Sequence, residues 1–157
     1  MPAIFVSMTS FIRTIIVLAM VRHAFGMPET PPNPVLVSLA LFLTAFTMAP
    51  TLSEVNSRAV QPLLAGTIGV EQAIERGSAP LRDFMLAQTR EDDLRLFVDL
   101  ANEPQPENAQ EIGAAVLVPA FVVSELRAAF LIGFIVFGLV VLPLLAHLDK
   151  AGLTRRH

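Results

Sequence analysis

Several residue types on which many proteins depend are missing from this chain. It contains no cysteine, which excludes disulfide bonds, thiolate-ligated iron–sulfur clusters and a thiol nucleophile. It contains no tryptophan and no tyrosine, so the aromatic belts of a lipid-anchored helix bundle are absent. Charged residues make up only 16% of the chain, against about a quarter in soluble domains. With 54% hydrophobic residues and a mean hydropathy of +0.61, the composition predicts a membrane protein.

Motifs for catalysis, cofactor binding and nucleic-acid binding are missing as well. The histidines His23, His147 and His157 are isolated and share no metal-site spacing. There is no phosphate-binding loop, no GxSxG sequence and no basic stripe for nucleic acid. Asp92 and Asp93 diverge on a helix, and they fit a helix N-terminus better than a metal site. We therefore expect no enzymatic activity, no cofactor, no metal and no nucleic-acid partner.

A long apolar run dominates the C-terminal part of the chain. Residues 114–146 form this run, and they include only two charges, Glu125 and Arg127. The stretch 128–146 contains no charge. About 20 apolar residues cross the hydrocarbon core of a bilayer, so this stretch predicts a membrane-spanning helix. Ionisable residues in such a helix are costly and usually face a partner or a wet cavity.

The two charges predict contacts between helices. Glu125 and Arg127 are two positions apart, so they point in different directions and need different partners. We expect Glu125 to pair with Arg13 or with Arg127 of a neighbouring copy, and Arg127 to pair with an acid or a helix C-terminus. The alternatives are a protonated Glu125, an Arg127 that reaches water and an Arg13 that extends to the cytoplasmic surface.

Small residues recur along the same helix at spacings of four. Such columns let helix backbones approach closely within a membrane. The alternative is that small residues recur here only because they are common. The set comprises Ala120, Ser124, Ala128, Ala129 and Gly133.

The rest of the chain divides by hydropathy and charge. Residues 1–50 hold two apolar segments, which we expect to pair as a helical hairpin that stops at Pro50. Residues 51–113 carry eleven acidic and five basic residues and read as helices, with Gly77 as a stop. Because Lys and Arg mark the cytoplasmic side of a membrane, we expect this acidic segment on the extracytoplasmic side and the basic tail at 149–157 on the cytoplasmic side. The long apolar helix is expected over 114–148.

Four blocks, in order, carry a resemblance to a known family. They are MTSFIRTIIVL (8–18), TPPNPVLVSLALFLTAFTMAP (30–50), APLRDFMLAQTREDDLRLF (79–97) and PAFVVSELRAAFLIGF (119–134). Together they resemble the FliP family of flagellar export-gate proteins and its counterparts in virulence type III secretion, over residues 2–137. Arg127 stands where the family usually has Lys, and Leu131 where it usually has Gln.

The resemblance implies an all-α integral membrane protein of the bacterial inner membrane, in a flagellar basal body or type III secretion base. It implies a helical channel assembly of several copies with FliQ-like and FliR-like subunits, surrounded by lipid, that passes unfolded secreted proteins. A second hypothesis is a small-solute transporter subunit with Glu125 and Arg127 as an intramembrane site. A third is an inactive, truncated remnant of an export-gate gene.

The resemblance also implies segments that this sequence does not display. Family members carry a signal region before the first block and further apolar segments after the last, one with a Met-rich stretch that seals the closed pore. None of the six methionines here lies beyond Met85. We therefore expect this chain, by itself, to lack that sealing element and not to restore motility to cells without their own FliP-like protein.

Overall fold

The fold is known from a computed structural model that describes residues 6–27 and 29–152. Within these ranges every regular element is a helix, so the predicted all-α class is confirmed. The elements are α2 (Phe11–Ala24), α3 (Asn33–Thr47), α4 (Ala49–Val55), the π-helical turn η1 (Asn56–Val60), α5 (Gln61–Leu64), α6 (Val70–Gln88), α7 (Glu91–Leu100), the 3-10 turn η2 (Ala109–Glu111) and α8 (Ala114–Lys150).

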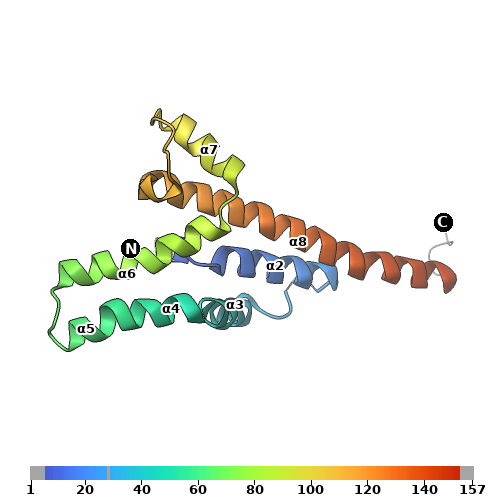
Figure 1. Ribbon diagram of the computed structural model, residues 1–157. Helices are drawn as coiled ribbons and strands as arrows, with labels where there is room; N and C mark the ends of the chain where they lie inside the picture. The colour runs from blue at the N-terminus through green and yellow to red at the C-terminus, as the bar shows by residue number, and fades with distance from the viewer. Residues whose placement is uncertain (1–5, 28, 153–157) are drawn as a thin grey trace.

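Helix α8 is the axis on which the other elements are arranged (Figure 1). Helix α2 packs along it, and α6 and α7 contact its N-terminal part. Arg13 of α2 contacts Glu125 of α8, and Met20, further along α2, contacts Gly133, further along α8. Residue numbers therefore increase in the same direction on both helices, so the two helices run parallel. Helix α3 contacts α2, and α4, η1 and α5 then run below α6 and contact it (Figure 1).

The hydrophobic core lies where α6 and α7 cover the start of α8. Phe121 and Leu117 of α8 are fully buried there, and the ring of Phe84 meets that of Phe121 edge-on at 5.9 Å between centroids. The other buried members are Met85, Val98, Ile112 and Val116. On α8, Phe121 follows Leu117 by four residues and Val116 by five, so these members lie on one side of the helix.

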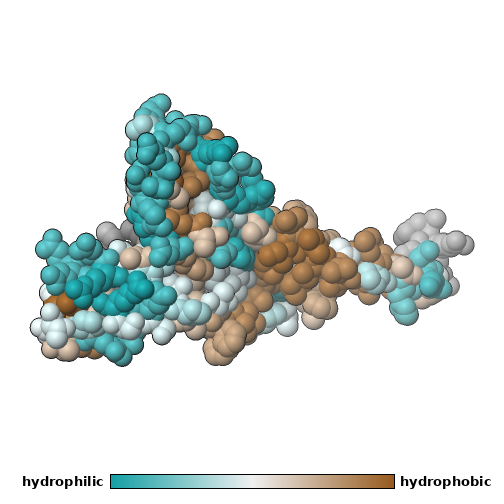
Figure 2. All heavy atoms as spheres, in the orientation of Figure 1, coloured by the Kyte–Doolittle hydropathy of each residue, from teal (hydrophilic) through white to brown (hydrophobic). Residues whose placement is uncertain are grey.

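Helix α8 extends beyond this core, and past Gly133 none of its described residues is buried. Its 37 residues rise about 55 Å at about 1.5 Å per residue, well beyond a hydrocarbon core of about 30 Å. Figure 2 shows hydrophobic surface concentrated on this projecting part. Among the described residues, α8 alone is long and apolar enough to cross a membrane; α3 and the α4–α5 stretch together would be a second candidate, bent by 67°.

The structure corrects several boundaries expected from the sequence. In the first apolar segment, residues 6 and 7 and then Phe11–Ala24 are helical, with a turn at 8–10 between them, and residues 3–5 lie outside the described residues. Pro50 does not end the helical path: it lies in the first turn of α4, where its missing N–H is not needed, and the chain bends there instead. The 50/51 boundary therefore falls inside a helix. Helix α8 continues to Lys150, two residues past the expected end, and 153–157 of the tail is not described.

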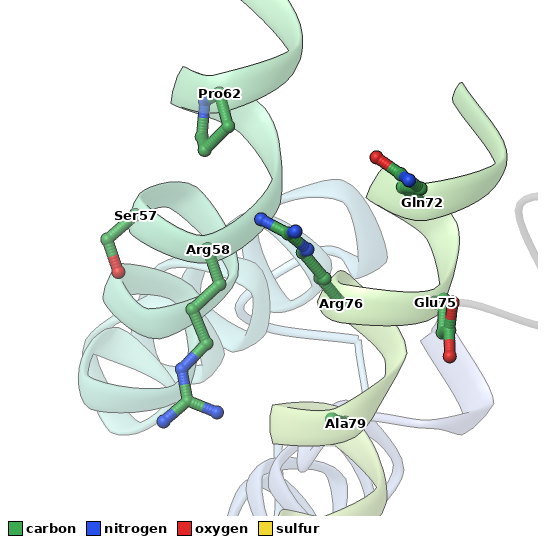
Figure 3. Close-up of a pocket in the computed structure, with 7 residues that line it drawn as sticks. All are labelled: Ser57, Arg58, Pro62, Gln72, Glu75, Arg76 and Ala79. Atoms are coloured by element: carbon green, nitrogen blue, oxygen red, sulfur yellow. The ribbon is translucent and has the colours of Figure 1, made fainter. Parts of the chain in front are cut away.

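Gly77 is also not a stop, because it lies inside α6. A Cβ at this position would be 3.2 Å from Cβ of Ala59 in η1, so glycine allows α6 and η1 to pack closely. Next to this contact, η1, α5 and α6 border a polar pocket of about 600 Å³ (Figure 3). The central acidic segment is thus helical, as the sequence predicts, and it presents a hollowed polar face.

Candidate functional site

The predicted charges and small residues share the inner face of α8. Glu125 is fully buried, although it is a carboxylate, and Ser124 is 2% exposed. Ala120, Ala129 and Gly133 are buried too, and Ala128 is half-buried. The structure therefore brings most of the predicted set to one helix face. Arg127 is the exception, because its side chain is 47% exposed and leaves this face.

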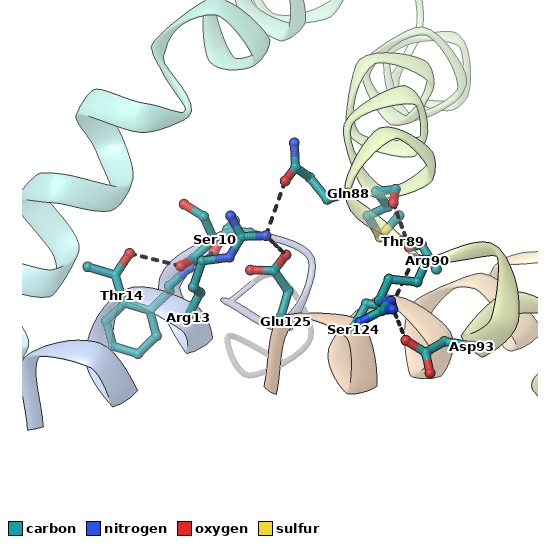
Figure 4. A network of polar contacts seen from close by, with 12 residues as sticks. Ser10, Arg13, Thr14, Gln88, Thr89, Arg90, Asp93, Ser124 and Glu125 are labelled. Atoms are coloured by element: carbon teal, nitrogen blue, oxygen red, sulfur yellow. Dashed lines mark hydrogen bonds and ion pairs between the residues drawn. The ribbon is translucent and has the colours of Figure 1, made fainter. Parts of the chain in front are cut away.

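Glu125 is paired with Arg13 across the α2–α8 contact (Figure 4). Nη2 of Arg13 donates to Oε1 of Glu125 at 2.5 Å, and also to Oε1 of Gln88 at 3.1 Å. One guanidinium thus connects α2 to α8 and to the end of α6. Of the partners that the sequence left open for Glu125, the structure contains the one within the same chain.

Arg127 is paired with Asp93 of α7 on the other side of α8. Nη2 of Arg127 lies 2.9 Å from Oδ1 of Asp93, whose side chain is only 1% exposed. Oδ2 of Asp93 accepts a hydrogen bond from Ser124 Oγ at 2.7 Å, and the backbone N–H of Arg90 donates to that same hydroxyl at 3.0 Å (Figure 4). Ser124 is therefore a hydrogen-bonding residue as well as a small one.

The local sequence explains why Asp93 points inward. Helix α7 begins at Glu91, and its first turn carries Glu91, Asp92 and Asp93, which suits the positive end of the helix dipole. Thr89 follows the last residue of α6 and donates from Oγ1 to the carbonyl of Met85. Of the three acids, Asp93 falls on the apolar face of α7 that packs against α8.

Sequence reasoning missed Asp93 and Gln88 as parts of this site. The sequence predicts only a helix N-terminal role for Asp93, although its position beside Leu94 and Phe97 is a signal that it faces the core. Gln88 carried no signal, because its role depends on where α6 ends relative to α2. The predicted residues Arg13, Ser124, Glu125 and Arg127 are all brought together by the structure.

Two buried polar atoms at this site have no hydrogen-bond partner among the described residues. They are Oε2 of Glu125 and Nε of Arg13. The pairing of Glu125 is therefore one-sided and depends on a single guanidinium. The described residues also contain no group of three His, Asp or Glu side chains that could hold a metal ion. What this arrangement can do is fix the positions of α2, α6, α7 and α8.

Gly133 provides a testable point on the α2–α8 contact. A Cβ here would collide with Sδ of Met20 and lie 2.8 Å from its Cε and 3.2 Å from its Cβ. The end of Met20 can move, but its Cβ is fixed to the backbone of α2. We expect Gly133→Ala to destabilise the protein by about 1–3 kcal/mol through overpacking, and Met20→Ala to relieve part of this.

Gly138→Ala is the matched control, because it lies on the same helix and has open space around it. Thermal unfolding in detergent should show it as neutral or slightly stabilising, since alanine favours a helix by about 1 kcal/mol over glycine. Equal effects of the two substitutions would mean that the close contact with Met20 is unimportant.

Comparison with known proteins identifies the family. The FliP family matches residues 1–146, which is nine residues past residue 137, where the resemblance seen in the sequence ends. The flagellar biosynthetic protein FliP of Pectobacterium carotovorum subsp. carotovorum is 52% identical over 137 residues, covering 87% of this chain and 53% of the relative. The protein of the same name from Caulobacter vibrioides is 48% identical over 136 residues, covering 87% and 51%.

A third relative is similar over almost the same length of this chain. The flagellar biosynthetic protein FliP of Bacillus subtilis is 45% identical over 136 residues, which is 87% of this chain and 62% of that protein. The chain thus spans about half the length of the curated relatives that it matches. The match includes both ion pairs described above, Arg13–Glu125 and Asp93–Arg127, which together are called the ionic site. This protein therefore belongs to the FliP family.

Proposed function

We propose that this chain is part of a subunit of the flagellar protein export gate, where it helps to form a helical channel assembly. The observation that carries the proposal is the two-part construction of α8. Its first part is fixed in the protein body by two ion pairs, and its second part is an exposed apolar helix. The flagellar names of the relatives agree with this assignment.

In this proposal the charge-free stretch at 128–146 crosses the bacterial inner membrane, because its 19 residues rise about 28 Å and a hydrocarbon core is about 30 Å thick. The acidic segment lies outside, and Lys150 with the basic residues after it lies inside, as the positive-inside rule requires. The ionic site then lies where the body meets the membrane. Arg127, half exposed, reaches the polar interface from there.

The exposed apolar surface requires partners. Phe130, Phe134 and Phe137 are 40–66% exposed on one side of α8, and α3 exposes Phe42 and Phe46 in the same way. Lipid, further copies of this chain and FliQ-like and FliR-like subunits are the proposed occupants of these faces. The assembly passes unfolded secreted proteins and performs no chemical step of its own.

A solute transporter with an open Glu125–Arg127 site is not favoured by any observation. Arg13 occupies one carboxylate oxygen of Glu125, and Asp93 occupies the guanidinium of Arg127. The two side chains leave α8 toward different helices, so they do not form one binding site for a solute.

A chimera tests the proposed function. Residues 1–146 of this chain would replace the matching half of the Pectobacterium relative, in cells that lack their own FliP. Secretion of flagellar proteins and motility are the expected results. A chimera that is present in the membrane at normal amounts but exports nothing would contradict the assignment; the unaltered relative is the control.

A further inference from the structure

Two arginines line a pocket in the acidic part of the chain. Arg58 of η1 and Arg76 of α6 border the polar pocket of about 600 Å³ (Figure 3). The remaining lining residues are Ser57, Pro62, Gln72, Glu75 and Ala79. Arg58 forms an exposed ion pair with Glu54 at 3.3 Å. Among the ion pairs of the described residues, none involves Arg76, so the pocket contains a guanidinium without a carboxylate partner.

An acidic loop lies elsewhere on the same chain. Residues 103–111 carry Glu103, Glu107 and Glu111, all exposed, and no ion pair between described residues includes any of them. Pro104 and Pro106 restrict the backbone of this loop. Three carboxylates are therefore presented on a short stretch with limited freedom.

The acidic loop is also fixed to the helices at both ends. Nε2 of Gln105 donates to Oδ1 of Asp99 in α7 at 2.9 Å. Nη2 of Arg82 in α6 donates to the carbonyl of Gln110 at 2.9 Å and to that of Ile112. A loop held in this way loses less conformational entropy when it binds.

A single copy cannot bring the acidic loop to its own arginine pocket. In Figure 1 the pocket elements η1, α5 and the start of α6 lie at one lower corner of the molecule, whereas the loop after α7 lies on the opposite, upper side. The pocket is built from packed helices and the acidic loop is hydrogen-bonded to α6 and α7, so neither reaches the other within one copy. A neighbouring copy has no such restriction.

We propose that the acidic loop at 103–111 of one copy docks into the Arg58–Arg76 pocket of the next copy. This inference rests on the proposed function, because it requires several copies in one assembly. The two surfaces differ, so the contact is head-to-tail, and repeating it produces a ring if the rotation closes. Complementary charge of this kind mainly fixes which surfaces meet and in which register.

Cross-linking tests the contact directly, because the chain has no cysteine of its own. Arg76→Cys and Glu107→Cys are introduced together into the full chain, and membranes are treated with a short bismaleimide. A ladder of cross-linked copies is expected. Arg76→Cys with Asp83→Cys is the matched control, since Asp83 is another exposed acid outside the loop, and no ladder is expected from it.

Charge reversal provides the second measurement. Arg58→Glu with Arg76→Glu should remove cross-linking between Ser57→Cys and Asn108→Cys, and adding Glu103→Lys with Glu107→Lys should restore it. Two differently tagged copies are co-purified in parallel. Copies that co-purify without any cross-link overturn this docking contact alone, and copies that do not co-purify overturn both the contact and the proposed assembly.

Discussion

Replacing Arg13 by alanine is expected to cost the protein about 3–5 kcal/mol of stability, because a buried carboxylate would lose its only cation. Glu125 is fully buried, and no other described residue donates to it. We expect a clear drop in the unfolding temperature in detergent and little protein in the membrane. Adding Glu125→Gln should recover part of the loss, because the buried group is then neutral.

Arg22→Ala is the matched control for Arg13→Ala, since both arginines lie on α2. Arg22 donates to Asn33 Oδ1 at 2.7 Å and to the Pro31 carbonyl at 3.2 Å, and both bonds are exposed. Its loss should cost about 1 kcal/mol, as for an ordinary hydrogen bond. If the two arginines prove equally important, the pairing with Glu125 is not what holds α2 on α8.

Asp93→Ala is expected to loosen α7 from α8 and to cost about 1.5–3 kcal/mol, the range for a hydrogen bond to a charged group. Arg127 and Ser124 both lose their shared acceptor. The effect is smaller than at Arg13, because Arg127 is half exposed and can reach water. Faster proteolysis within residues 103–111 should accompany it, since this loop follows α7.

The neighbouring acid provides a control that matches Asp93 closely. Asp92 lies in the same first turn of α7 but is exposed, so Asp92→Ala removes the same charge from the same helix end. Only the dipole contribution is lost there, about 0.3–1 kcal/mol. Similar unfolding temperatures for the two variants would show that the inward contacts of Asp93 add nothing.

The helices were predictable because their hydropathy is periodic or continuous. The apolar run predicted α8 to within two residues, and Asp92 with Asp93 indicated the helix N-terminus that lies at Glu91. The breaks were less predictable. Proline and glycine usually interrupt helices. Pro50, however, lies in the first turn of α4, where its missing N–H is not needed, and Gly77 allows α6 to pack closely against Ala59.

The ionic site was predictable only in part, for a physical reason. Glu125 lies inside an apolar run, where a carboxylate needs a cationic partner. Arg13 is a cation inside another apolar segment, so opposite charge in apolar surroundings was enough to predict this pair. Asp93 lies in a charged stretch where one more acid is not unusual. Its spacing of four from Phe97 places it on the apolar face of α7, but its contacts with Arg127 and Ser124 depend on the angle at which α7 crosses α8, and no local pattern determines that angle.

The central claim is that ion pairs within one chain hold the other helices against α8. Exchanging the charges of Arg13 and Glu125 tests this claim most directly. Arg13→Glu and Glu125→Arg should each abolish the detergent-resistant assembly, and both changes in one chain should restore it in part. Co-expression of the two single variants as separate chains should restore nothing. Recovery upon co-expression, without recovery in the double variant, would show that the pair joins neighbouring copies and would contradict this account.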